Sequence, residues 1–111
     1  MAYDEDMAAR VRDILAPERG LSEKRMFGGL AFLLDGHMTV AVSGQGGLLL
    51  RVDPARSDEL VTAAHVSRMV MRGREMDGWL RVDPAAIDTE DRLTGWVSQG
   101  VTYVRTLPPK E

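Results

Sequence analysis

Five residues on predicted strands have the types and the spacing that contacts with anions require. Side chains alternate across a strand, so residues two positions apart share a face of a sheet. By this alternation Arg68 and Arg72 share a face in a predicted strand over 67–72, and Trp79 and Arg81 share one over 79–82. Guanidinium groups beside an aromatic ring suit contacts with phosphate or carboxylate and stacking on bases. With Arg51 of the strand over 48–52, these residues form a candidate anion- or partner-binding face: Arg51, Arg68, Arg72, Trp79 and Arg81.

The opposite faces of the last two strands are apolar. Met69 and Met71 alternate with the arginines of one strand, and Leu80 and Val82 occupy the matching positions of the next. We expect helices to cover this apolar face, with the methionines filling an irregular core. Arginines on the solvent side of a half-buried sheet are also ordinary, and the sequence alone favours that simpler interpretation over a binding role.

Other residues do not form a recognisable active site. The chain has no cysteine, which excludes disulfides, thiolate metal sites and a cysteine nucleophile. His37 and His65 have no partner at metal-ligand spacing and are expected to be solvated loop residues. The Gly28-Gly29 pair lacks the surrounding residues of a phosphate-binding loop, and the serines lack the Gly-x-Ser-x-Gly context. We therefore expect no catalytic residue, no cofactor and no metal.

Two long helices and one short helix are predicted around the strands. A helical apolar period runs over 4–16, with carboxylates in the first turn where the helix dipole favours them. Asp53-Pro54 is a typical helix start, which predicts a short helix to about residue 64. A third helix is predicted over 89–107, where Gly95 and Gly100 indicate either close packing on the sheet or a tolerated weakness.

The strands are marked by apolar, β-branched runs separated by turn residues. They are expected over 23–27, 30–34, 38–43, 48–52, 67–72 and 79–82. Gly28-Gly29 predicts a bulge or a tight bend, Asp35-Gly36 predicts a hairpin turn, and 73–78 reads as a hairpin loop. Short connections between consecutive strands imply antiparallel pairing. We expect one α+β domain over 1–111, a two-layer α/β fold with an antiparallel sheet of five to six strands.

Charge and targeting signals limit the classes of function. The net charge is -3, although residues 19–81 carry nine basic and seven acidic groups and so are mildly basic. A dedicated duplex DNA binder is usually more basic. The start of the chain is acidic, and the longest apolar run, over 30–34, is much shorter than the roughly 20 residues of a membrane span. We expect a cytoplasmic protein.

Two motifs resemble those of a known family. Residues 24–32 read Lys-Arg-Met-Phe-Gly-Gly-Leu-Ala-Phe, and 73–79 read Gly-Arg-Glu-Met-Asp-Gly-Trp. They are similar to the Lys-x-Met-Phe-Gly-Gly-x-x-Phe and Gly-x-x-Met-x-Gly-Trp patterns of the TfoX/Sxy N-terminal domain family. The residues that carry the resemblance are Lys24, Met26, Phe27, Gly28, Gly29, Phe32, Gly73, Met76, Gly78 and Trp79. The resemblance extends over nearly the whole chain.

The resemblance implies a two-layer domain with an antiparallel sheet and supplies no catalytic residues. The best-known members regulate natural competence in bacteria, are thought to act with a cyclic-AMP-dependent transcription activator, and carry a second, C-terminal domain. We expect a stand-alone N-terminal domain that acts as a non-enzymatic adaptor in transcription regulation. Its expected partner is another protein, with a transcription factor as one candidate. The alternative is direct binding of nucleic acid or another anion through the arginine-bearing face. A homodimer stays open.

Overall fold

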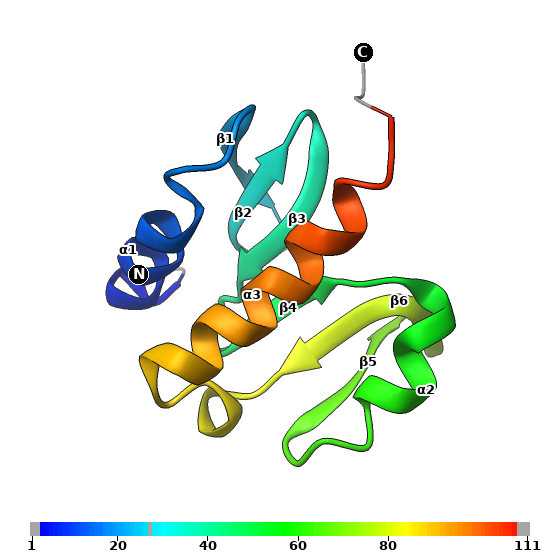
Figure 1. The fold of residues 1–111 in the computed structure, drawn as a ribbon. Coiled ribbons are helices and arrows are strands. Elements are labelled where there is room, and N and C mark those ends of the chain that lie inside the picture. The colour runs from blue at the N-terminus through cyan, green and yellow to red at the C-terminus, as the bar shows by residue number, and fades with distance from the viewer. Residues whose placement is uncertain (1–2, 27, 109–111) are drawn as a thin grey trace.

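The computed structural model describes residues 3–26 and 28–108, and in this part of the chain six strands form one antiparallel sheet. The strands are β1 (Leu21–Met26), β2 (Gly29–Leu34), β3 (His37–Val42), β4 (Leu48–Arg51), β5 (Val66–Met71) and β6 (Arg74–Val82), in the spatial order β1-β2-β3-β4-β6-β5. The helices are α1 (Glu5–Leu15), α2 (Ser57–Leu60) and α3 (Glu90–Val104), with short 3-10 helices η1 (Pro54–Arg56) and η2 (Pro84–Ala86). The α+β prediction is confirmed (Figure 1).

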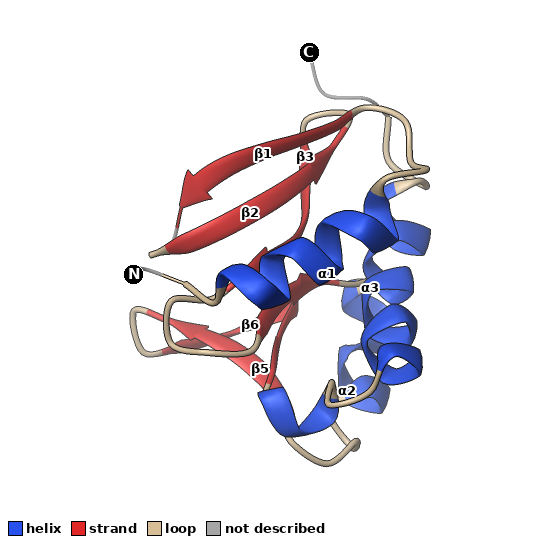
Figure 2. Cartoon of the chain, turned by 90° about the vertical axis from the view of Figure 1, so that its left-hand side faces the viewer, coloured by secondary structure: helices blue, strands red, loops and turns tan. Residues whose placement is uncertain are grey.

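The described helices gather on one side of the sheet, which gives two layers (Figure 2). The main core lies between these layers. It is built by Val11 and Leu15 of α1, Leu93 and Val97 of α3, and the sheet residues that face them. The sheet residues in this core are Leu30, Phe32, Val40, Val42, Leu48, Leu50, Val66, Leu80 and Val82. No helix in the described ranges is both long and apolar enough to cross a membrane.

Helix α1 is fixed at its start and along its length. The Asp4 carboxylate accepts hydrogen bonds from the backbone N–H groups of Asp6 and Met7, which confirms the predicted start to within one residue. Arg12 donates two hydrogen bonds to the Glu23 carboxylate, at 2.5 Å and 2.9 Å. These bonds favour the charged carboxylate and lower the pKa of Glu23. The pair ties α1 to the edge strand β1.

The first two hairpin turns depend on backbone conformations that glycine accepts. In the β1–β2 hairpin Met26 pairs with Gly29, so Gly28, with φ of 72°, belongs to a tight bend and not to a bulge. A Cβ at Gly29 would lie 1.9 Å from the Val42 carbonyl oxygen, so β2 and β3 meet too closely there for any side chain. Asp35 and Gly36 both have positive φ, which confirms the predicted hairpin turn.

The last hairpin differs from its prediction. Strand β6 begins at Arg74 and not at Trp79, and the turn consists of Arg72 and Gly73, with φ of 55° and 77°. The segment 73–78 is therefore mostly strand, not loop. The sequence misleads here because Gly78 marks an irregularity inside a strand, not its end: the pairing register shifts from Arg68–Leu80 to Met69–Met76, and residues 77–79 have no partner in β5.

The predicted helices around this hairpin need smaller corrections. The middle helix starts as predicted, because the Asp53 carboxylate accepts a hydrogen bond from the Ala55 N–H at 2.9 Å, but its α-helical part ends at Leu60 and not near residue 64. Helix α3 starts after the Thr89 cap and ends at Val104, three residues before the predicted end.

The two glycines of α3 occupy different surroundings. A Cβ at Gly100 would lie 2.9 Å from Leu50 Cδ1 and 3.1 Å from the carbonyl oxygens of Arg51 and Thr39. A Cβ at Gly95 would have no atom within 4 Å. Gly100 therefore allows the helix to approach the sheet closely, whereas Gly95 is a tolerated weakness.

This difference predicts opposite effects of the same substitution. Gly95→Ala should raise the free energy of unfolding by about 1 kcal/mol, which is the helix-propensity gain. Gly100→Ala gains the same propensity but crowds two backbone carbonyls, and such overpacking costs about 1–3 kcal/mol, so the net effect is a loss of up to about 2 kcal/mol. Urea unfolding followed by circular dichroism measures both, with Gly95→Ala as the matched control. Equal stabilisation by both would contradict the close contact.

Candidate functional site

The face of the sheet that points away from the helices, here called the outer face, has its own small apolar cluster. Ala31, Met38, Ala41 and Leu49 are buried there, with exposed fractions between 0 and 8%. Ala31 and Ala41 are opposed partners on β2 and β3. Larger side chains from neighbouring strands pack over these small ones: Met26, Leu33, Met69 and Trp79. The middle of the outer face is thus closed without a second layer of helices.

The β5–β6 end of the outer face carries a hollow. Met69, Met71, Met76 and Trp79 line a pocket of 220 Å³, which we call the methionine pocket. Met71 is 37% exposed, and the adjacent Val70 is 60% exposed. Among the described residues, Met71 and Val70 are the exposed large hydrophobic side chains. A solvent-facing apolar hollow of this size has room for one apolar side chain of another molecule.

The structure corrects the predicted faces of the last two strands. Leu80 and Val82 are fully buried beneath the helices, as expected. Met69 and Met71 were expected beside them, but both line the outer pocket. Strand β5 alternates regularly from the core residue Val66 through Arg68, so its two methionines face outward. The register shift reverses the alternation in β6 instead, because residues 77–79 have no partner in β5, and it turns Met76 to the same outer side.

The predicted arginine face is divided between different parts of the molecule. Arg68 lies opposite the buried Leu80, on the helix side, and donates hydrogen bonds to Asp58 and Asp77. These hydrogen bonds raise the pKa of Arg68. Arg72 lies in the β5–β6 turn. The prediction that Arg68 and Arg72 share a face with Arg51, Trp79 and Arg81 is therefore wrong.

Arg81 remains on the outer face, with its guanidinium engaged by the protein itself. Its N–H groups donate to the Gly46 carbonyl oxygen at 3.0 Å and, over 3.3–3.4 Å, to Ser43 Oγ and the Gln45 carbonyl oxygen. The Asp83 carboxylate lies 3.9 Å away. Arg81 thus holds the turn between β3 and β4, which leaves little of its charge for a ligand.

Arg51 is held differently, by aromatic rings. Its guanidinium carbon lies 5.3 Å from the centroid of the Trp79 ring and 5.6 Å from that of Tyr103, so two cation–π contacts fix its position. Arg51 and Trp79 are opposed partners on β4 and β6. Within residues 3–26 and 28–108, no carboxylate forms an ion pair with Arg51.

The motif residues divide into two groups. Gly28, Gly29, Gly73 and Gly78 have backbone roles, and Phe32 is fully buried in the main core. At Gly78 the N–H donates to Ser57 Oγ at 2.7 Å, and a Cβ would lie 3.0 Å from Pro54 Cγ. Lys24 and Met26 alternate on the outer side of β1, and Met76 and Trp79 line the pocket. Phe27 lies outside the described residues.

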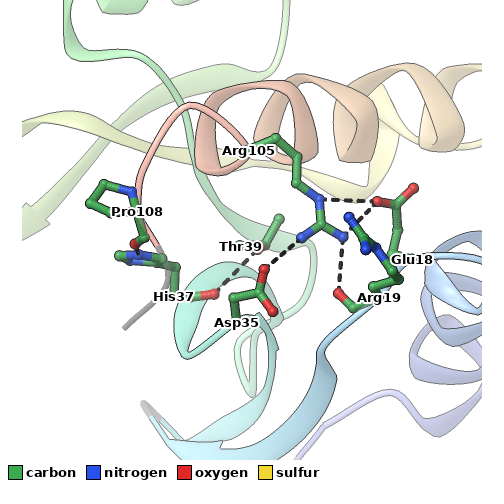
Figure 3. Close-up of polar contacts among 7 residues, drawn as sticks. All are labelled: Glu18, Arg19, Asp35, His37, Thr39, Arg105 and Pro108. Carbon is green, nitrogen blue, oxygen red and sulfur yellow. Dashed lines mark hydrogen bonds and ion pairs between the residues drawn. The ribbon is translucent and has the colours of Figure 1, made fainter. Parts of the chain in front are cut away.

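Polar contacts near the end of α3 stabilise the fold without forming a site. Arg105 donates to the Glu18 and Asp35 carboxylates and to the Arg19 carbonyl oxygen, which joins α3 to the loops before β1 and β3 (Figure 3). His37 Nε2 donates to the Pro108 carbonyl oxygen at 2.6 Å, so this histidine begins a strand and is bonded, not a free loop residue. In the chain as described, no group of three or more His, Asp or Glu side chains could hold a metal.

Sequence reasoning missed the pocket role of Met69 and Met71 and the contact of Tyr103 with Arg51. The signal that could have indicated the outward methionines is Val66, an apolar residue two positions before Arg68 and therefore on the same face as Arg68. Gly78 could have indicated that Met76 turns outward, because an interior glycine often marks a bulge. The Tyr103 contact joins residues from β4 and α3, and no local pattern encodes it.

The corrected faces predict the cost of two substitutions. Met71→Ser should cost at most about 1 kcal/mol, because more than a third of this residue is exposed and only part of its apolar surface is covered on folding. Leu80→Ala should cost about 2–5 kcal/mol, because it empties a fully buried position. Chemical denaturation of both variants measures the difference. A comparably large loss for Met71→Ser would place Met71 in the core, as the alternation first suggested.

Comparison with known proteins agrees with the motifs and the fold. The sequence pattern of the TfoX N-terminal domain matches residues 13–103, a range that begins within α1, contains every described strand and ends within α3. Among curated proteins none matches the chain significantly. The matched family is a regulatory domain family that is not known as catalytic. The motifs, the two-layer fold and the extent of the match together show that this chain belongs to the TfoX N-terminal domain family.

Proposed function

We propose that this domain is a non-enzymatic adaptor in transcription regulation that binds another protein through its outer sheet face. The observation that carries the proposal is the methionine pocket of Met69, Met71, Met76 and Trp79, an apolar hollow on the side of the sheet opposite the helices. Its family is regulatory, which agrees with a binding role.

The lining of the pocket suits recognition of a protein. Apolar surface kept in water costs roughly 25 cal/mol per Å², so covering the pocket on binding is favourable. Methionine side chains are flexible and polarisable and adapt to different partners, and tryptophan is enriched among the residues that dominate binding energy at interfaces. The pocket joins three methionines and one tryptophan in a single hollow.

The geometry favours a protein partner over a nucleic acid. Arg68 is engaged by two carboxylates on the helix side, and Arg81 is engaged by the β3–β4 turn. A phosphate backbone is bound by several cations that lie along one surface, and the structure separates the arginines that were expected to form it. The net charge of -3 also opposes a polyanion.

Site-specific photo-crosslinking in the cells that naturally produce the protein tests this function. The photoreactive residue p-benzoylphenylalanine replaces Met71 in one variant and Ser98, an exposed position on α3, in the control. We expect a discrete protein adduct from position 71 and none from position 98, because the contact is confined to the outer face. A further Met76→Glu change, which puts charge into the pocket, should reduce the adduct.

The composition of the adduct decides the outcome. Mass spectrometry that identifies a different protein supports the adaptor function. An adduct of two copies of this chain would replace the adaptor function with self-association. Equal labelling from positions 71 and 98, or none from position 71, would contradict recognition through the outer face.

A further inference from the structure

Arg51 and the methionine pocket are joined by a shared residue. Trp79 lines the pocket and also contacts the Arg51 guanidinium, whose carbon lies 5.3 Å from the ring centroid. Arg51 and Trp79 are directly opposed on β4 and β6, and side chains in such pairs begin about 4.5–5.5 Å apart. A charged group and an apolar hollow therefore lie within the reach of neighbouring residues of one peptide.

The Arg51 guanidinium is held in place while its charge stays available. The rings of Trp79 and Tyr103 restrict its motion, and no carboxylate of the described residues pairs with it. In the described part of the chain no side-chain nitrogen or oxygen is buried without a hydrogen-bond partner. The N–H groups of Arg51 that lack a protein acceptor must consequently face water, where a ligand can reach them.

A second cation lies at the other end of the pocket. Arg74 is opposed to Met71 in the β5–β6 ladder, and opposed residues point to the same face. Arg74 is exposed and, like Arg51, has no ion pair within residues 3–26 and 28–108. The apolar hollow is thus bordered by positive charge at both ends, and the complementary ligand is apolar in its middle and acidic at its flanks.

We infer that Arg51 and the methionine pocket form one recognition site for an acidic–apolar peptide segment of a partner protein. This inference rests on the proposed function and names the chemistry of its ligand. A large apolar side chain enters the pocket, and a carboxylate adjacent to it or two residues away pairs with Arg51. A guanidinium matches a carboxylate with two parallel hydrogen bonds, and the two rings reduce the entropy lost when those bonds form.

Two other occupants fit less well. A second copy of the chain, docked about a two-fold axis, would bring Arg51 and Arg74 of both copies towards one shared interface and add like-charge repulsion. A single-stranded nucleic acid would stack successive bases on aromatic rings along a row of cations, whereas the pocket lining offers one indole among three thioether side chains. The charge at both ends of the pocket selects an acidic segment.

Selection from a library of random short peptides displayed on phage identifies a probe. The whole chain is the target, and we expect enriched peptides that have Asp or Glu within two residues of a large apolar residue. The affinity of one enriched peptide is then measured by Trp79 fluorescence in a Trp96→Phe background, which leaves Trp79 as the single tryptophan.

Matched variants separate the two halves of the site. Arg51→Gln should weaken binding by about tenfold or more, the loss expected for a charge-assisted hydrogen-bonded pair. Arg25→Gln on β1, opposite the core residue Leu30, is the control and should leave affinity unchanged. A peptide with Gln in place of its Glu should lose affinity for the wild-type protein by a factor similar to that of Arg51→Gln. This comparison uses only the wild-type protein, so it does not depend on whether a variant folds.

Several results would overturn the inference. Enriched peptides without an acidic residue, or equal affinity of wild type and Arg51→Gln for the peptide, would rule out the proposed contact between Arg51 and a carboxylate. If the adduct from position 71 were still found, the adaptor function would survive that result. A failure to enrich any peptide, a dimer in sedimentation whose formation depends on Met71, or Arg51-dependent binding of oligothymidylate would each show that this site serves another ligand.

Discussion

The structure depends on a sheet whose described helices lie on one side only. The core residues of the sheet face these helices, and the apolar residues of α1 and α3 complete the same core. A sheet buried on one face presents the other to water. The outer face must therefore limit its exposed apolar surface without a covering layer of helices, and this requirement explains its composition.

The outer face meets the constraint in two ways. In its middle, the small residues Ala31 and Ala41 sit under larger neighbours, so little apolar surface remains in water. At the β5–β6 end, the regular alternation of β5 places Met69 and Met71 outward, and the register shift turns Met76 of β6 to the same side, which leaves the methionine pocket open. The irregular strand that would be a defect in a purely structural sheet is the feature that creates a candidate binding surface.

Local chemistry explains which features the sequence predicted. Asp35-Gly36 and Asp53-Pro54 specify their turn and helix start through backbone preferences of neighbouring residues, and alternation placed Leu80 and Val82 correctly. The β5–β6 register was not predictable in the same way, because Gly78 is held by Ser57 and packs against Pro54, residues more than twenty positions earlier. Arg68 was assigned to the wrong face because the helices were expected over the methionine side of β5, whereas Val66, two residues before Arg68, lies in the main core. Only the folded chain brings Tyr103 onto Arg51, so the proposed ligand contact could not be read from the strand pattern.

Recognition through the outer face requires the methionine pocket to be open to solvent in the free domain. Methyl NMR of ¹³C-methyl methionine, recorded with and without a soluble paramagnetic probe, measures this directly. We expect much stronger relaxation enhancement for the methyl group of Met71, a residue 37% exposed, than for that of Met38, which is 8% exposed. Equal protection of the two methyl groups would show that the pocket is already covered in the free domain and would contradict recognition through it.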